Sequence, residues 1–168
     1  MRLDVIYSTG LIGILLLALY LKRRFASTFS ATSHKNAATA YEIPHVIKQL
    51  QQSARDGNFV VFLFVPPDST DGEAVNLQYS IEDGIIGLDW VLIGPRNIAD
   101  RTKISEFAAT LGYRFKECEM NDTRYLRVTG SGISDLGKSI IKDFYKLNLN
   151  TKLDLVTEGF EWQPQAFV

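Results

Sequence analysis

The chain has little of what builds disulfide-linked or metal-centred proteins: it contains one cysteine, Cys118, and two histidines in 168 residues. One cysteine excludes an intrachain disulfide framework and a metal cluster held by several cysteines. His34 and His45 are too few for a histidine-rich site. A hydrophobic fraction of 46% and a charged fraction of only 22% exclude disordered, collagen-like and low-complexity proteins for most of the length. The length therefore predicts one folded domain with an additional segment.

Neither sign of charge is in excess over the whole chain, whose net charge is −1, but its two parts differ. Residues 1–40 carry five basic and one acidic residue (+4), whereas residues 41–168 carry 13 basic and 18 acidic residues (−5). A domain at −5 repels the phosphate backbone, so we expect no nucleic-acid partner. Arg114, Arg124 and Arg127 lie close in the sequence, and we interpret them as a solvated strand face.

The N-terminal part holds a 17-residue run without charge, residues 5–21. As a helix this run would be about 25 Å long, which flanking residues can extend to a bilayer core. We therefore predict a transmembrane anchor over residues 1–24 and contact with a lipid bilayer through residues 5–21. A cleaved signal peptide is less consistent, because the basic cluster at residues 22–24 follows the apolar run instead of preceding it.

The same basic cluster predicts orientation, since cytoplasmic flanks carry the excess of Lys and Arg. We expect a single-pass membrane protein with a cytoplasmic C-terminal domain, in the inner membrane if the source is bacterial. Residues 25–40 are rich in Ser, Thr, Ala and Asn and show no hydrophobic period, which predicts a flexible linker.

Residues 41–168 show the alternation of helix and strand patterns of one α+β domain. Helical spacing begins near Tyr41 and ends before Gly57, and a second helix is expected from about Asn97 and a third over residues 134–147. Residues 58–65 show no alternation, which is typical of a strand covered on both faces. Two hairpins are expected, over residues 75–93 and 113–129, and residues 153–162 are left as a last strand or a packed tail.

The predicted order is α-β-β-β-α-β-β-α, and its hairpins imply an antiparallel sheet with helices on one face. With the hairpin sequences VNLQYSIEDGIIGLDWVLIG and YRFKECEMNDTRYLRV, this order resembles the type III secretion chaperone-like fold, which includes the YbjN-like family. The resemblance covers residues 41–150. It implies a noncatalytic domain that binds another protein, often as a homodimer, and it assigns no functional residue.

One segment matches a nucleotide-binding pattern. Gly132, Gly137, Lys138 and Ser139 fit G-x-x-x-x-G-K-[ST] after a predicted strand, so a nucleotide-binding protein is an alternative function. However, the apolar residues from Ile133 onwards continue one helical period through the supposed loop. We therefore interpret Gly132 as a turn residue, Gly137 as a small residue that allows helix packing, and Lys138 as a solvated side chain.

Catalytic and metal-binding combinations are sparse. Cys118 lies between Glu117 and Glu119, and neighbouring carboxylates disfavour a thiolate, so pairing with His45 as a nucleophile is disfavoured. Asp68 and Asp71 lack the spacing and terminal Glu of a calcium loop. We therefore expect no catalytic residue, metal or cofactor, and a protein that is not an enzyme.

Trp90, Arg96 and Asn97 form the candidate partner-binding site, because Trp and Arg dominate the energy of protein interfaces. The alternative is that Trp90 shares the alternation of its strand and belongs to the core. The sequence thus predicts a membrane-anchored protein-binding domain of chaperone or adaptor type. An accessory subunit of a membrane complex, packed through the small residues 8–13 of the anchor, is a further alternative.

Overall fold

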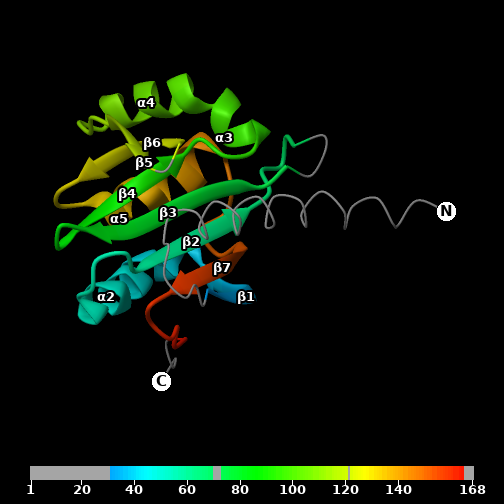
Figure 1. Ribbon diagram of the computed structural model, residues 1–168. Coiled ribbons are helices and arrows are strands. Elements are labelled where there is room, and N and C mark those ends of the chain that lie inside the picture. Colours follow the sequence, from blue (N-terminus) through cyan, green and yellow to red (C-terminus); the bar gives the residue numbers. More distant parts are fainter. Residues whose placement is uncertain (1–30, 70–72, 121, 165–168) are drawn as a thin grey trace.

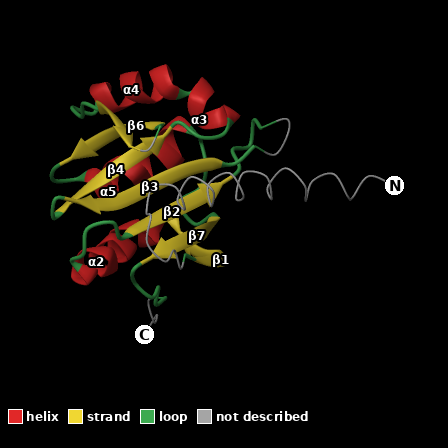
Figure 2. Cartoon of the chain, in the orientation of Figure 1, coloured by secondary structure: helices red, strands yellow, loops and turns green. Residues whose placement is uncertain are grey.

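The computed structural model describes residues 31–69, 73–120 and 122–164, which form an α+β fold around one antiparallel sheet (Figures 1 and 2). The seven strands have the order β1-β7-β2-β3-β4-β6-β5. Their bounds are Thr32–Thr39 (β1), Phe59–Phe64 (β2), Val75–Glu82 (β3), Ile85–Val91 (β4), Lys116–Met120 (β5), Thr123–Thr129 (β6) and Lys152–Glu158 (β7). The helical elements are the 3-10 turn η1 (Ala40–Glu42), α2 (Ile43–Ser53), α3 (Pro95–Ala99), α4 (Arg101–Thr110), α5 (Ile133–Ser139) and the π-turn η2 (Ile140–Phe144).

The predicted antiparallel α+β architecture is confirmed, including both hairpins. Between β3 and β4 the turn residues Asp83 and Gly84 have φ of 52° and 72°, as a tight hairpin turn requires. The helix expected from about Asn97 is two helices, α3 and α4, which meet at Asp100. The helix expected over residues 134–147 begins at Ile133 and changes to the π-turn η2 at Ile140.

The N-terminal boundary of the domain differs from the prediction. Residues 32–39, assigned to a flexible linker, form the edge strand β1, which pairs with β7. A bulge between His34 and Ala38 interrupts the pairing, and the carboxylate of Asp154 accepts a hydrogen bond of 2.7 Å from the backbone N–H of Asn36 there. An edge strand with a bulge and one largely exposed side has no regular alternation, which explains why the sequence pattern does not reveal it.

The prediction of a single-pass membrane protein is wrong. Within the described ranges, no helix has both the length and the apolar character needed to cross a bilayer. The assigned anchor at residues 5–21 lies outside these ranges, and so do residues 8–13, on which the accessory-subunit alternative depends. The membrane location and the bilayer contact are therefore withdrawn.

The helices pack against one face of the sheet and form the main core with it. In Figure 1, α2 and α5 lie behind the strands. Alternate strand residues such as Val60, Leu77 and Trp90 belong to this core, together with Leu50 of α2 and Ile140 of η2. We call this side of the sheet the helical face.

The opposite side, which we call the second face, carries a separate apolar cluster. Its buried members come from the four strands β2, β4, β6 and β7, and no residue of a described helix belongs to it. These members are Phe59, Val61, Leu63, Val91, Tyr125 and Val156. Along each strand, the residues that alternate with those of the helical face therefore form a second core.

A buried ion pair lies among these apolar side chains on the second face. Arg127 Nη1 donates to Asp89 Oδ1 at 2.5 Å and to Ser80 Oγ at 2.9 Å, and its Nη2 donates to the carbonyl oxygen of Ile85 at 3.0 Å. The guanidinium lies against Gly87, where a Cβ would collide with it. Arg127 is thus buried, and its assignment to a solvated strand face is wrong.

The ion pair generates a prediction about stability. Asp89→Ala should lower the free energy of unfolding by about 3 kcal/mol, because Arg127 would stay buried with only the more distant carboxylate of Glu82, at 3.5 Å, as its partner. Asp89→Ala combined with Arg127→Met should lower it by less, since the buried guanidinium is then removed together with its nearest carboxylate. Denaturant unfolding of the full chain measures both.

The control is Glu117→Ala, which removes solvent-accessible ion pairs with Arg101 and Arg124 and should cost at most about 1 kcal/mol. An Asp89→Ala variant no less stable than this control would contradict the assignment of Arg127 and Asp89 to a buried pair.

Candidate functional site

The segment that matches a nucleotide-binding pattern is helical. Residues 133–136, which would have to form the phosphate-wrapping loop, are the first turn of α5, and Gly132 precedes them with φ of 79°. Gly137 packs against the hydroxyl of Tyr79, and this hydroxyl donates to the carbonyl oxygen of Ile133 at 3.0 Å. Lys138 forms an ion pair with Asp135 at 2.7 Å, and Ser139 ends the helix. The segment therefore joins the sheet to a helix and has no open loop between its two glycines.

Two of the three residues predicted to bind a partner are fully buried. Trp90 lies in the main core, and its indole Nε1 donates to the carbonyl oxygen of Asn97 at 2.9 Å. The Asn97 side chain accepts from the backbone N–H of Asn76 at 3.1 Å and donates to the carbonyl oxygen of Asn76 at 2.8 Å. Asn97 thus bonds to the β3 backbone as a neighbouring strand would. Trp90 and Asn97 fix α3 to the sheet and have no surface to offer a partner.

Arg96, the third residue, bridges two carboxylates. Its Nη2 lies 2.9 Å from Asp68 and its Nε 2.6 Å from Asp100, while the guanidinium lies 5.5 Å from the ring centre of Tyr145. The hydrogen bond from Arg96 lowers the pKa of Asp68, and burial, then the hydrogen bond to Asp100, raises the pKa of Tyr145. The guanidinium of Arg96 and the carboxylates of Asp68 and Asp100 neutralise one another, and their ion pairs hold α3 in place.

The remaining predicted residues do not assemble into a catalytic or metal site. Cys118 lies on β5 at one edge of the sheet, and His45 lies on α2, which packs near β2 and β3 (Figure 1). Asp68 pairs with Arg96, and Asp71 lies outside the described residues. Within the part of the chain that the structure describes, no three His, Cys, Asp or Glu side chains are grouped to hold a metal ion.

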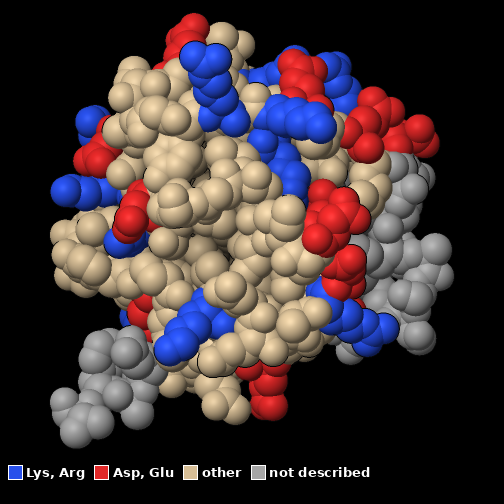
Figure 3. Space-filling model, turned by 90° about the vertical axis from the view of Figure 1, so that its left-hand side faces the viewer, with Lys and Arg blue, Asp and Glu red and all other residues tan. Residues whose placement is uncertain are grey.

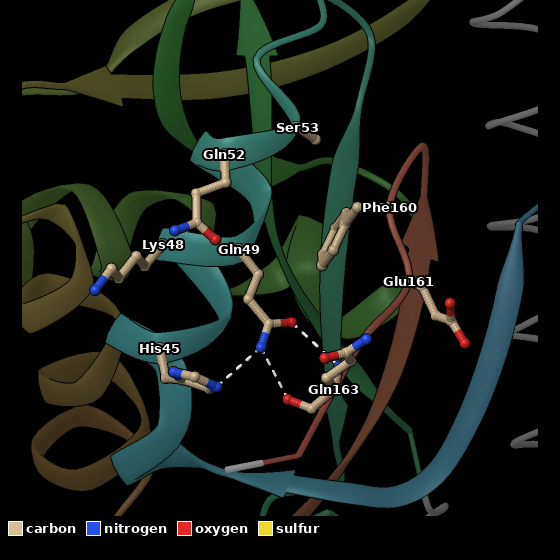
Figure 4. Close-up of a pocket in the computed structure, with 8 residues that line it drawn as sticks. All are labelled: His45, Lys48, Gln49, Gln52, Ser53, Phe160, Glu161 and Gln163. Carbon is tan, nitrogen blue, oxygen red and sulfur yellow. Dashed lines mark hydrogen bonds between the residues drawn. The ribbon is translucent and has the colours of Figure 1, made fainter.

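A polar groove separates α2 from the C-terminal segment (Figure 4). The Gln49 side chain bridges it: Nε2 lies 2.8 Å from His45 Nε2 and donates to the carbonyl oxygen of Gln163 at 2.8 Å. In return, Gln49 Oε1 accepts from the backbone N–H of Gln163 at 3.1 Å. These bonds hold the C-terminal segment to α2, so the polar groups that converge here already pair with one another.

A second groove lies where β4 leaves the sheet, beside α3 and the β5–β6 hairpin. We call it the Ile98 groove, and it is lined by Leu92, Ile93, Ile98, Arg101, Thr102, Asp122, Thr123 and Arg124. Ile98 is 57% exposed, although it follows the buried Asn97 on the same short helix. The exposed side chain of Ile98 thus lies on a helix that Trp90 and Asn97 hold to the sheet.

Two arginines border the Ile98 groove and share one carboxylate. Arg124 lies 3.1 Å from Glu117, and Arg101 pairs with the same side chain. The guanidinium of Arg124 and then that of Arg101 lower the pKa of Glu117. All three side chains are solvent-accessible, so these pairs contribute little to stability and can exchange at low cost.

Ile98 is not among the residues predicted from the sequence to bind a partner, which were its neighbours Trp90, Arg96 and Asn97. The signal that could have identified it is the spacing within the helix: Ile98 and Asn97 lie on different sides of α3, and only one of them can face the sheet.

Charged side chains are interspersed on the molecular surface. On the face shown in Figure 3, Lys and Arg alternate with Asp and Glu mainly around the rim, and the centre is formed by other residues. The β3–β4 turn points toward this side in Figure 1, and Ile85 at that turn is 55% exposed. Ile85 and Ile98 are thus two isoleucines of nearly equal exposure at different places on the surface.

The comparisons with known proteins add no assignment. The chain matches no family model, no curated protein and no solved structure. The resemblance to the type III secretion chaperone-like fold therefore stays a prediction.

The contact between Gly137 and Tyr79 predicts that this glycine has a packing role. Gly137→Ala should lower the free energy of unfolding by about 1–3 kcal/mol, because the added methyl group collides with the Tyr79 hydroxyl. Tyr79→Phe removes that hydroxyl, so the double variant should lose less than the sum of the two single changes. Denaturant unfolding measures all three proteins.

Lys138→Ala is the control, since it removes only an exposed i,i+3 ion pair and should change stability by less than about 0.5 kcal/mol. Additive losses for Gly137→Ala and Tyr79→Phe would contradict the packing explanation.

Proposed function

We propose that this chain is a noncatalytic protein-binding domain, and that it binds its partner through the Ile98 groove. The observation that carries the proposal is the 57% exposure of Ile98 beside Leu92 and Ile93. An apolar centre bordered by arginines is a frequent composition of interface hot spots.

The lining of the groove specifies the chemistry of the partner. Leu92, Ile93 and Ile98 provide apolar surface for an aliphatic or aromatic side chain. Arg101 and Arg124 provide guanidinium groups that bind a carboxylate in bidentate geometry. The proposed partner therefore presents an apolar side chain next to an Asp or Glu.

Binding would exchange one ion pair for another. Glu117 is accessible to solvent, and its pairs with Arg101 and Arg124 are screened, so a partner carboxylate can replace it without leaving a buried charge. The apolar contact then supplies most of the affinity, and the carboxylate supplies orientation.

The anchoring of α3 suits this role. Trp90 and Asn97 hold the helix to β3 and β4 from below, and Arg96 clamps it to Asp68 and Asp100 from the side. Because the helix is fixed before binding, little conformational entropy is lost when a partner contacts Ile98.

The chain offers a matched pair of variants that tests the proposal. Ile98→Asp should weaken binding of the copurifying partner at least about tenfold, because it places a charge in the apolar centre. Ile85→Asp changes an isoleucine of nearly equal exposure, 55%, on another side of the molecule and should leave binding unchanged. The partner is first identified by mass spectrometry with the full chain and then titrated as a purified protein against each variant.

Equal binding by Ile98→Asp and the unsubstituted chain would overturn the assignment to this groove. A partner lost equally from both isoleucine variants would contradict it too, provided that circular dichroism shows both variants folded. Sedimentation of the same proteins tests the homodimer that the fold resemblance implies: a dimer that Ile98→Asp alone dissociates would identify a second copy as the partner.

A further inference from the structure

The Gln49 side chain ties the C-terminal segment (residues 159–164) to α2 across the polar groove between them, which we call the α2 groove (Figure 4). We propose that its hydrogen bonds to His45 and Gln163 form a pH-sensitive latch, which is closed while His45 is neutral and opens when the ring takes up a proton. The inference does not depend on the proposed function, because the α2 groove and the Ile98 groove share no lining residue among those described.

The orientation of the Gln49 side-chain amide is fixed by the backbone of Gln163. Nε2 donates to the carbonyl oxygen of Gln163 at 2.8 Å, and Oε1 accepts from the backbone N–H of the same residue at 3.1 Å. The opposite orientation would bring oxygen against oxygen and N–H against N–H, so two hydrogen bonds would become two repulsive contacts. The nitrogen of this amide therefore faces His45.

His45 has to accept at this contact. Its Nε2 lies 2.8 Å from Gln49 Nε2, and an amide nitrogen is only a donor. The ring nitrogen at the contact is consequently the one without a hydrogen, and the proton of the neutral ring lies on Nδ1. Both hydrogens of the Gln49 amide nitrogen are then used, one on His45 and one on Gln163.

A second proton on the ring removes the acceptor. It binds at His45 Nε2, the nitrogen that carries no hydrogen, and places an N–H group against the amide N–H group of Gln49. Turning the amide over would offer Oε1 to the new N–H group, but it would break both bonds to Gln163. In either orientation the protonated ring is incompatible with the closed latch, so the latch opens as the pH falls.

Histidine is the side chain whose charge ordinarily changes between pH 5 and 8, unlike those of lysine and glutamate. The charged residues that line the α2 groove are Lys48 of α2 and Glu161 of the C-terminal segment. Neither bonds to the Gln49 amide, whose partners are His45 and Gln163. The pH response of the groove is therefore assigned to His45.

The elements next to α2 carry further ionisable groups, which lie outside the groove and have other partners or surroundings. Asp135 and Lys138 of α5 pair with each other, Glu42 of η1 accepts from the backbone N–H of Thr39, Glu82 of β3 lies beside Arg127, and Lys142 and Asp143 of η2 do not line the groove. Tyr79 of β3 stays uncharged, because burial raises the pKa of its hydroxyl. Strand β2 has no ionisable side chain.

The second histidine of the chain provides an internal comparison. His34 Nε2 lies 3.4 Å from the hydroxyl oxygen of Thr157. A hydroxyl both donates and accepts, so this contact is compatible with either protonation state of His34. The latch depends on the pairing of His45 with an amide nitrogen, and histidine titration elsewhere in the chain should leave it closed.

Opening of the latch separates the two sides of the α2 groove, a cavity of about 450 Å³ that Gln49 and Gln163 line together. Trp162 should stay in place, since it is 6% exposed, belongs to the main core and lies edge-on to His45 with 5.7 Å between ring centres. A protonated imidazole is also attracted to an indole ring. The release therefore begins at Gln163, and Trp162 is the hinge.

Nuclear magnetic resonance of the unsubstituted full chain tests the latch. The heteronuclear NOE of the Gln163 backbone N–H reports its picosecond-to-nanosecond motion and should fall by at least about a third between about pH 7.5 and about pH 5.5. The midpoint of this fall should equal the midpoint of the His45 ring signals. An unchanged NOE, or a midpoint that follows His34 or Glu161 instead, would overturn the proposal.

Three variants separate His45 from other titrating groups. His45→Gln should keep the latch closed at both pH values, because its amide oxygen accepts from Gln49 and takes up no proton, whereas His45→Lys should leave it open at both, because an ammonium group only donates. His34→Gln is the matched control and should respond as the unsubstituted chain does. A pH response that persists in His45→Gln or disappears in His34→Gln would overturn the proposal, and so would a rigid Gln163 in His45→Lys.

Discussion

The central strands of this fold have to bury both of their faces, and the rest of the structure follows from that constraint. Strand β2 reads FVVFLF, and all six of its residues are buried. Its neighbour β3 is buried over seven of its eight residues. A sheet with such strands cannot face water on either side, because each exposed aliphatic side chain would forfeit roughly 1.5–3 kcal/mol of burial.

The two faces meet this constraint with different chemistry. The helical face is closed by α2, α4 and α5 and is mainly apolar, with Trp90 and Tyr145 stacked at 6.5 Å between ring centres. The second face combines six apolar side chains with the Arg127–Asp89 pair. A buried ion pair contributes little net stability, but it tolerates few alternative arrangements and so favours one register of β4 against β6.

The proposed interaction site depends on the same sheet. Trp90 lies in the core near the end of β4, and its indole bonds to Asn97, so the chain that follows the strand is tied to the sheet. Ile98 is the first residue beyond this tie whose side chain points to solvent. The rigid position of an exposed isoleucine is thus a consequence of core packing one residue earlier.

The sequence predicts part of this fold well. Residues 58–65 lack alternation, so a strand covered on both faces was expected there, and the Asp83-Gly84 turn specified the central hairpin. Edge strand β1 was not predictable, because its bulge and exposure remove the periodic signal.

The long-range features escaped sequence reasoning for a physical reason. Arg127 looks like any solvated strand residue, and only its pairing with β4 brings it to Asp89. Trp90 was ambiguous for a related reason, since a large aromatic residue on a strand suits both a core and an interface.

The burial of the second face is the central claim, and methyl NMR of the unsubstituted full chain tests it most directly. A soluble paramagnetic agent broadens methyl signals according to their access to solvent. The account predicts that the methyl groups of Val61, Leu63 and Val91 are as little affected as those of Val60, while Ile98 is strongly broadened. Broadening of Val61 and Val91 to the level of Ile98 would show an open second face and contradict the account.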